Sequence, residues 1–210
     1  MKKLIKNFNV NNLTKTKNAL TVLLTAVIIS TTSCSKSDPT PEPVSPVLAP
    51  LQDPLAGYLT ASGFSQKNVD NVNNDDYEFG YSFIPLVSGK MTAIVAKLPA
   101  SRLAMRVTIW DKVTTAILTT ETIDVATANV EVIKQITALD LVKDKEYFIS
   151  MNSNDWYKRT RINNSSVTYP FTVGDIKITS YAFGNGTSQT MPIASQISYY
   201  AGDCSFKFQK

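Results

Sequence analysis

Residues 102–111, RLAMRVTIWD, carry the clearest structural pattern in the sequence. Apolar residues occupy every second position, and they are Leu103, Met105, Val107 and Ile109. Strict alternation puts the two sets of side chains on opposite faces of a β-strand. The stretch therefore predicts a strand with an aliphatic face in a core and Trp110 on the other face, beside Arg106. A strand-end tryptophan packs readily under a crossing loop, which favours a structural role for Trp110.

The same period extends in both directions along the chain. Tyr77, Phe79, Tyr81 and Phe83 alternate with small or polar residues. Further short segments of strand character are 90–98, 116–125, 130–136, 146–151, 175–183, 197–200 and 204–208. Helical periodicity is nearly absent, so we expect an all-β fold, a single antiparallel β-sandwich from about residue 57 to 210. Its expected core contains Leu103, Met105, Val107, Ile109, Tyr147 and Ile149.

Four segments in this order carry a resemblance. They are FGYSF (79–83), GKMTA (89–93), VTIWD (107–111) and LVKDKEYFIS (141–150). Together they resemble an uncharacterised family of bacterial extracellular jelly-roll domains of unknown function. The chain departs from the family pattern at Asp144 and Lys145, near an expected glycine, and at Ile109, where the family has leucine. The resemblance implies a jelly-roll-like fold and an extracellular address, and it implies no catalytic residue.

The N-terminus has the layout of an export signal. Residues 1–18 contain five lysines and no acidic residue, an apolar run follows at 19–29, and TTSC closes the segment at 31–34. The apolar run is too short to cross a bilayer, which takes about 20 residues. The TTSC motif resembles a bacterial lipobox, although Thr31 stands where leucine is usual. We expect residues 1–33 to be removed and Cys34 to carry the lipid that anchors the protein to a membrane; an ordinary secretory signal and a short membrane anchor are the alternatives.

A proline-rich stretch separates this signal from the strands. Six of the ten prolines lie between residues 39 and 54. Proline fixes φ and lacks a backbone N–H, so residues 34–56 are predicted to be an extended linker rather than packed structure. We expect the linker to carry the domain from the cell envelope, with the outer membrane as the favoured site and surface exposure suggested by the segment that follows Cys34.

Composition excludes several classes of function. The discarded segment holds five of the 21 basic residues and none of the 17 acidic ones, so the mature chain is nearly neutral and gives no electrostatic case for nucleic acid. The chain contains no histidine, which removes Ser-His-Asp and Cys-His catalysis and most catalytic zinc sites. No cofactor motif occurs. Cys204 shares a predicted strand face with Phe206 and Phe208, and a small buried hydrophobe is its favoured reading.

Residues 152–161, NSNDWYKRTR, combine two large rings with three cations. A loop on a rigid scaffold commonly holds binding residues, and aromatic rings stack on sugars while cations attract acidic groups. The candidate ligand-binding residues are therefore Trp156, Tyr157, Lys158, Arg159 and Arg161. The alternative is that the two rings close one end of the sandwich and the cations form a solvated edge.

Two further sets of oxygen-bearing side chains are candidates, one for Ca²⁺ binding and one for glycoside hydrolysis. The segment 70–76 offers Asp70, Asn73, Asp75 and Asp76 as weak candidate Ca²⁺ ligands, but its spacing matches no EF-hand loop, and a turn is the favoured reading. Carboxylates that could form a glycosidase pair are Glu121, Asp124, Asp140, Glu146 and Asp175. None stands out, so no catalytic residue and no metal site is assigned.

Three hypotheses of function follow. The first is a lipid-anchored, non-catalytic binding module whose ligand is a glycan or a cell-surface polymer. The second is a structural or accessory subunit that contacts a protein partner through strand edges and residues 152–161. The third and least favoured is a glycoside hydrolase that uses a carboxylate pair.

Overall fold

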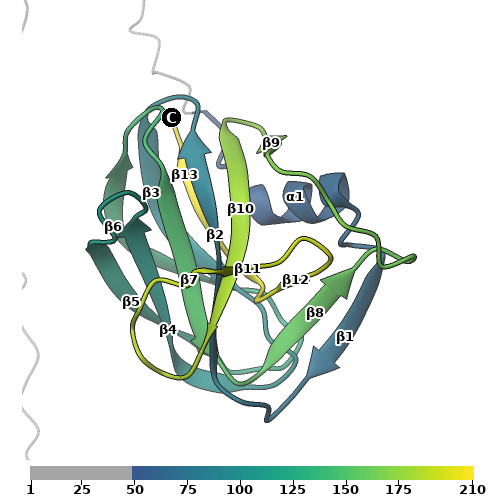
Figure 1. Cartoon of the computed structure of the whole chain (residues 1–210). Helices are drawn as coiled ribbons and strands as arrows, with labels where there is room; N and C mark the ends of the chain where they lie inside the picture. Colours follow the sequence, from purple (N-terminus) through teal and green to yellow (C-terminus); the bar gives the residue numbers. More distant parts are fainter. Residues whose placement is uncertain (1–48) are drawn as a thin grey trace, which may run out of the picture. The chain divides into compact units, whose positions relative to one another are not determined.

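The structure is a computed structural model that describes residues 49–210. The predicted signal, Cys34 and most of the predicted linker lie outside the described residues. Within residues 49–210 the chain forms three antiparallel sheets and one helix (Figure 1). The prediction of an all-β antiparallel sandwich is confirmed.

The largest sheet contains most of the strands that the alternation predicts. Its strands are β2 (Tyr77–Pro85), β4 (Arg102–Asp111), β5 (Ile117–Val125), β7 (Tyr147–Ser153), β9 (Phe171–Val173), β10 (Ile176–Asn185) and β11 (Ala194–Ser195). They are ordered β11-β10-β2-β7-β4-β5, and β9 pairs with β10. The pairs β4-β5 and β10-β11 are consecutive in sequence, but β10, β2, β7 and β4 are neighbours from distant parts of the chain. The predicted strands are therefore found, but their order could not be read from the chain.

The second sheet covers one face of the first. It consists of β3 (Gly89–Ala96), β6 (Val132–Leu141) and β13 (Cys204–Gln209), in the order β13-β3-β6. In the pairing of β3 with β13, Lys207 pairs with Ala93 but Phe208 pairs with Met91, so β3 contains one extra residue in a β-bulge. The bulge changes the phase of the alternation, so Met91 faces the core together with Ile94 and Ala96. Strict alternation over residues 90–98 predicts instead that Met91 shares a face with Ala93 and Val95, and the bulge is the reason that this prediction is wrong.

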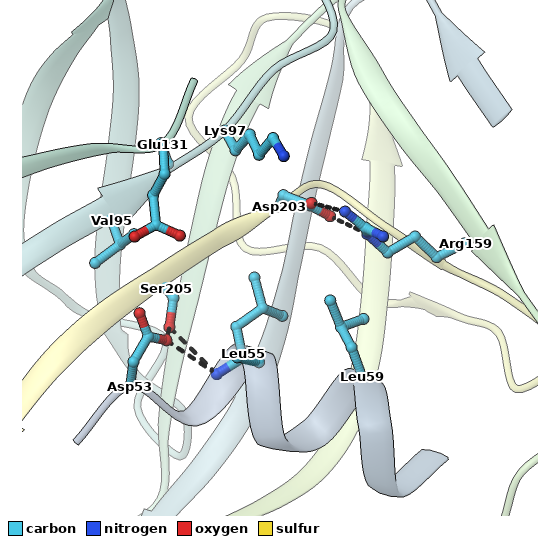
Figure 2. Close-up of a pocket in the computed structure, with 11 residues that line it drawn as sticks. Asp53, Leu55, Leu59, Val95, Lys97, Glu131, Arg159, Asp203 and Ser205 are labelled. Carbon is cyan, nitrogen blue, oxygen red and sulfur yellow. Dashed lines mark hydrogen bonds and ion pairs between the residues drawn. The ribbon is translucent and has the colours of Figure 1, made fainter. Parts of the chain in front are cut away.

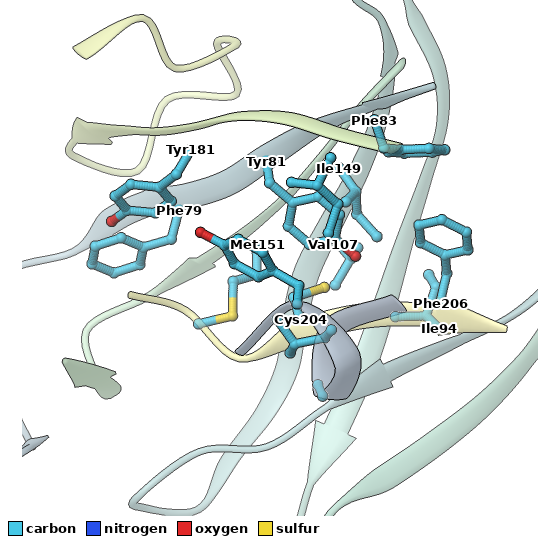
Figure 3. Packing of buried hydrophobic residues seen from close by; sticks show 14 of the residues in the cluster. Phe79, Tyr81, Phe83, Ile94, Val107, Ile149, Met151, Tyr181, Cys204 and Phe206 are labelled. Carbon is cyan, nitrogen blue, oxygen red and sulfur yellow. The ribbon is translucent and has the colours of Figure 1, made fainter. Parts of the chain in front are cut away.

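The core lies between these two sheets (Figure 3). Phe83 of β2 packs against Phe206 of β13 with ring centroids 4.6 Å apart and against Tyr147 of β7 at 5.6 Å. Cys204 is buried in the same cluster, and burial raises the pKa of its thiol. The predicted core residues Met105, Val107, Ile109, Tyr147 and Ile149 are all buried. Cys204 is the small buried hydrophobe that the sequence indicates.

Leu103 is the predicted core residue that the structure contradicts, because its side chain is 70% exposed. The pairing of β4 with β5 shifts register between Arg102 and Met105. Ala104 lies in this bulge with φ +49°, and its backbone N–H donates to Asp124 Oδ1 over 2.7 Å. The bulge therefore turns Leu103 outward, and the inward alternation begins only at Met105.

A small third sheet and the helix complete the fold. The sheet consists of β1 (Lys67–Asn71), β8 (Trp156–Thr160) and β12 (Tyr200–Ala201), in the order β1-β8-β12. The helix α1 (Pro54–Ser62) lies beside β9 and β13, and its Tyr58 packs edge-on to Tyr200 with centroids 5.4 Å apart. Of the predicted strand 197–200 only Tyr200 pairs with another strand, and it forms the two-residue strand β12 together with Ala201.

The helix corrects the predicted boundary between linker and domain at residues 56 and 57. Asp53 caps it by accepting a hydrogen bond from the Leu55 N–H, Pro54 occupies the first turn, and Gly63 ends it with φ +78°. Ahead of the cap, Gln52 exchanges two backbone hydrogen bonds of 2.9 Å with Phe208 of β13. The packed structure therefore begins before residue 53, inside the segment predicted to be linker.

Candidate functional site

Residues 152–161 are not the predicted loop: they run from the end of β7 through a short turn into β8, and the two strands belong to different sheets. The chain leaves β7 at Ser153, turns at Asn154 and Asp155, and returns as β8. The turn is fixed from outside, because the Asn73 N–H donates to Asp155 Oδ1 over 2.7 Å and the Asn74 N–H to the Asn154 carbonyl over 3.0 Å. Since β8 has β1 on one side and β12 on the other, its backbone is paired along both edges.

The two aromatic residues of β8, Trp156 and Tyr157, do not share a face. Trp156 packs in an aromatic group with Phe79 and Tyr77, at centroid distances of 5.0 and 6.0 Å. Tyr157 is 2% exposed and donates its hydroxyl to Asn129 Oδ1 over 2.6 Å. Consecutive residues of a strand point to opposite sides, and here both rings pack within the domain. The structure therefore does not bring Trp156 and Tyr157 together as one surface.

The three cations are also separated, and each has a partner inside the chain. The Lys158 ammonium lies 4.7 Å from the centroid of the Tyr199 ring. Arg159 forms a two-point ion pair with Asp203, in which Nε donates to Oδ1 over 2.7 Å. Arg161 donates from Nε to the Ser62 carbonyl over 2.7 Å, at the end of α1. The predicted cluster of free positive charge is not formed.

The oxygen-rich segment 70–76 contacts the turn between β7 and β8. Asp70 lies exposed in β1 and accepts from Asn68 Nδ2, and Asp76 pairs with Arg102 at 3.2 Å. The backbone of Asn73 has φ +52° and reaches Asp155, while the Asp75 N–H donates to Asn74 Oδ1. Among the described residues, no group of three His, Cys, Asp or Glu side chains is placed to hold a metal ion. The hydrogen bonds and the ion pair within and around residues 70–76 explain this segment as a turn.

A different set of polar residues gathers on the outer side of the largest sheet. Strand pairing places them in three adjacent rows across β2, β7, β4 and β5. The rows are Glu78, Asn152, Arg106 and Thr122; Gly80, Ser150, Thr108 and Thr120; and Ser82, Phe148, Trp110 and Ile117. The opposite face of the same strands is the core, so this face combines donors, acceptors and one aromatic pair on a rigid scaffold.

Glu78 and Arg106 form the most buried charged pair of this face. Glu78 is 3% exposed and accepts a short hydrogen bond from Arg106 Nη2. Burial raises the pKa of Glu78, and the Arg106 guanidinium opposes this shift. Glu78 Oε2 and Arg106 Nε are both buried and have no hydrogen-bond partner. Unpartnered buried polar atoms are costly, so this pair is a place where an additional donor and acceptor would be stabilised.

One loop, residues 186–193, covers these rows and is called the crossing loop below. It leaves β10, passes over the sheet and returns as β11 (Figure 1). Its Thr187 carbonyl accepts from Arg106 Nη2 over 2.9 Å, and its Gly186 carbonyl accepts from Asn152 Nδ2 over 2.9 Å. Gln189 Nε2 donates to Thr108 Oγ1 and Thr120 Oγ1 over 3.1 and 2.6 Å. The loop is thus held by polar contacts to the first two rows.

Trp110 lies where the crossing loop ends. It is 3% exposed, forms a cluster with Phe148 and Ala182 against which Met191 packs, and donates from Nε1 to Ser150 Oγ over 3.1 Å. The prediction that Trp110 packs under a crossing loop is confirmed, while Arg106 pairs with Glu78. Beside Trp110 lies a surface hollow of about 360 Å³, whose lining includes Gln189, Thr190 and the 87% exposed Ile193.

The carboxylates considered for glycoside hydrolysis are not assembled here. Glu121, Asp140 and Asp175 pair with lysines, and Asp124 accepts from the Ala104 N–H. Glu146 stands six positions from Asn152, the residue that pairs with Glu78, so the two glutamates lie roughly 20 Å apart along the strands. A glycosidase pair needs a separation of about 5–10 Å. Glu78 and Glu146 are therefore not placed as such a pair.

Sequence reasoning missed Glu78 and Asn152 as site residues. The alternation does place Glu78 and Arg106 opposite the core faces of their strands, which is the one signal that the sequence offers. Their meeting depends on the pairing of β2, β7 and β4 in space.

No helix within residues 49–210 has the length and apolar character needed to span a bilayer. Compared with known proteins, the chain matches no family model and no curated protein.

Proposed function

We propose that this chain is a lipid-anchored protein of the bacterial cell envelope whose β-sandwich is a non-catalytic, glycan-binding domain. The anchor is Cys34, and the favoured location is the outer membrane with the domain facing outward. The ligand site is the row of Glu78, Asn152 and Arg106 together with the hollow beside Trp110. The all-β fold agrees with the resemblance to bacterial extracellular jelly-roll domains.

One observation carries the glycan assignment: Glu78 Oε2 and Arg106 Nε belong to one ion pair, and both atoms are buried and without hydrogen-bond partners. The first atom accepts a hydrogen bond and the second donates one. A sugar hydroxyl does both, so a pair of neighbouring hydroxyls satisfies the two atoms at once. Trp110 and Phe148, two rows away, add the apolar surface on which a sugar ring packs.

Binding at this site requires the crossing loop to move. Its contacts to the rows are hydrogen bonds from Arg106, Asn152 and Gln189, each of which a ligand hydroxyl can replace. The loop has few apolar contacts, chiefly that of Met191 with the Trp110 cluster. A segment held mainly by exchangeable polar contacts opens at a lower free-energy cost than a packed one.

The test is a glycan array followed by calorimetric titration, with the Cys34→Ala protein. The double variant Glu78→Gln, Arg106→Gln removes both charges and keeps a polar side chain at each position, and it should lose binding. The matched control is Lys90→Gln, Asp140→Asn, which removes an exposed ion pair from the second sheet and should bind normally. An array without any signal, or equal binding by both double variants, would reject the proposal.

The second candidate is an accessory subunit that binds a protein partner. The observation in its favour is β1, an edge strand of the third sheet whose residues from Lys67 to Asp70 are all exposed. An edge strand offers unpaired backbone groups to another chain. Co-purification with one defined protein, lost when Val69→Pro blocks this edge, together with a silent glycan array, would favour this candidate.

A further inference from the structure

A separate cavity of about 180 Å³ lies between α1 and the sheet formed by β13, β3 and β6 (Figure 2). Leu55 and Leu59 of α1 point into it from one side, and Val95 of β3 lines the other. These three side chains make an apolar wall. Charged residues surround the rest of the cavity, so its lining is amphipathic.

Two of the charged groups at the cavity are neutralised within the chain. Asp53 accepts from Lys207 Nζ over 3.0 Å, and its other oxygen accepts from Ser205 Oγ and the Leu55 N–H. Asp203 is 5% exposed and is paired with Arg159. These bonds hold the cavity walls: the first set fixes the start of α1, and the second joins β8 to the end of the turn before β13.

Of the charged residues that line the cavity, Lys97 and Glu131 form no ion pair with another residue of the described range 49–210. The Lys97 side chain extends toward Asp203, so two cations face one buried carboxylate at this end and leave one positive charge in excess (Figure 2). Glu131, which is exposed, also lines the cavity. The cavity therefore presents one net positive end and one negative group beside an apolar wall.

The volume limits what can enter. An apolar cavity of about 150 Å³ in another protein takes up benzene, so a cavity of about 180 Å³ encloses roughly seven non-hydrogen atoms. A slightly larger ligand extends through the opening beside the exposed Ala56. A monosaccharide with its shell of hydroxyls finds no partners along Leu55, Leu59 and Val95. The lining fits a short aliphatic group attached to one cationic and one anionic centre.

We propose that this cavity binds a free α-amino acid with an aliphatic side chain. Its carboxylate faces Lys97 and Arg159, its ammonium group faces Glu131, and its side chain lies on Leu55 and Leu59. Each charged end then has a counter-ion from the protein, and the apolar part leaves water. This site is independent of the sheet face assigned to glycans.

The experiment is calorimetric titration of the Cys34→Ala protein with L-leucine as the probe. We expect saturable binding, reduced about tenfold or more by Glu131→Gln and by Lys97→Met, the effect of losing one hydrogen bond to a charged group. Two leucine analogues separate the ends of the ligand: 4-methylpentanoic acid lacks the ammonium group, and leucinol lacks the carboxylate. Both should bind at least about tenfold more weakly than leucine.

A filled cavity provides the decisive control. Ala56 lines the cavity and is exposed on α1, so Ala56→Phe places a ring in the opening at small cost to folding. Ala61→Phe makes the same change at an exposed position of the same helix away from this cavity. Leucine binding should disappear in Ala56→Phe and persist in Ala61→Phe, with both variants melting as the parent does. No heat of binding at millimolar leucine, unchanged binding in Ala56→Phe, or equal binding of either analogue would overturn the proposal.

Discussion

Arg159 and Asp203 form a two-point ion pair that joins β8 to the residue preceding β13, with Arg159 Nε donating to Asp203 Oδ1 over 2.7 Å. Their side chains are 16% and 5% exposed. The sequence predicts that Arg159 binds a ligand together with Lys158 and Arg161. In the structure Arg159 is instead the counter-ion of the buried carboxylate of Asp203. Arg159 therefore stabilises the folded state by neutralising the buried Asp203 carboxylate.

Arg159→Met should lower the free energy of unfolding by about 3 kcal/mol, because a buried carboxylate loses its counter-ion. Lys158→Met is the matched control: it removes a neighbouring cation that lies over the Tyr199 ring, and it should cost no more than about 1 kcal/mol. Urea denaturation measures both. Equal losses in the two variants would show that the pair with Asp203 contributes nothing particular.

Glu78 gives a pH dependence with a definite sign. Because burial raises its pKa above the ordinary 4.5, the folded state keeps the proton to higher pH than the unfolded state. Its contribution to stability is then complete below the ordinary pKa and is lost as the pH rises through the raised value. The free energy of unfolding of the parent should therefore fall relative to that of Glu78→Gln across this window. Denaturation series from about pH 3.5 to about pH 7 test this, and a constant difference would contradict it.

The crossing loop can be followed through Trp110. Trp156→Phe leaves Trp110 as the only tryptophan of the chain. In this background Gln189→Ala removes two hydrogen bonds to the sheet, so acrylamide quenching of Trp110 should increase and glycan affinity should rise by up to about tenfold. Gln135→Ala, an exposed glutamine on the second sheet, is the control. Unchanged quenching would show that Gln189 does not hold the loop closed.

The anchor is tested by Cys34→Ala. Several acyl chains make membrane attachment stable, so this change should shift the protein from the membrane fraction to the soluble fraction and abolish labelling with a radioactive fatty acid. Ser37→Ala, three residues further on, should leave both unchanged. A Cys34→Ala protein that stays in the membrane fraction and retains residues 1–33 would refute lipid anchoring at this cysteine.

The sequence was informative where a strand has one face in the core. Alternation identified β2, β4, β7 and β10 and most of their buried residues, and it put Trp110 on the outer face. It failed at Leu103 and Met91, because a bulge changes the phase of the alternation without a composition signal. The helix α1 has only nine residues, and its cap (Asp53), its first residue (Pro54) and its end (Gly63) are signals that the proline-rich surroundings obscured.

The candidate site was less predictable for a physical reason. Trp156 and Tyr157 looked available because charged residues surround them. In the structure β8 lies between two other strands, and the two rings pack within the domain on opposite sides of β8. The pairing of Glu78 with Arg106 joins residues 28 positions apart. It follows from β7 lying between β2 and β4, an arrangement that periodicity within each strand does not encode.

The backbone pairing of Gln52 with Phe208 has a mechanical consequence. Any pull on the chain ahead of residue 49 reaches this bridge and the Asp53–Lys207 ion pair before it reaches the core. The load is passed to β13, the last strand, so the two ends of the domain share one anchoring point. Stretching the protein by its N-terminus should accordingly peel residues 49–53 from β13 first and leave the sandwich closed, as a low-force step ahead of global unfolding.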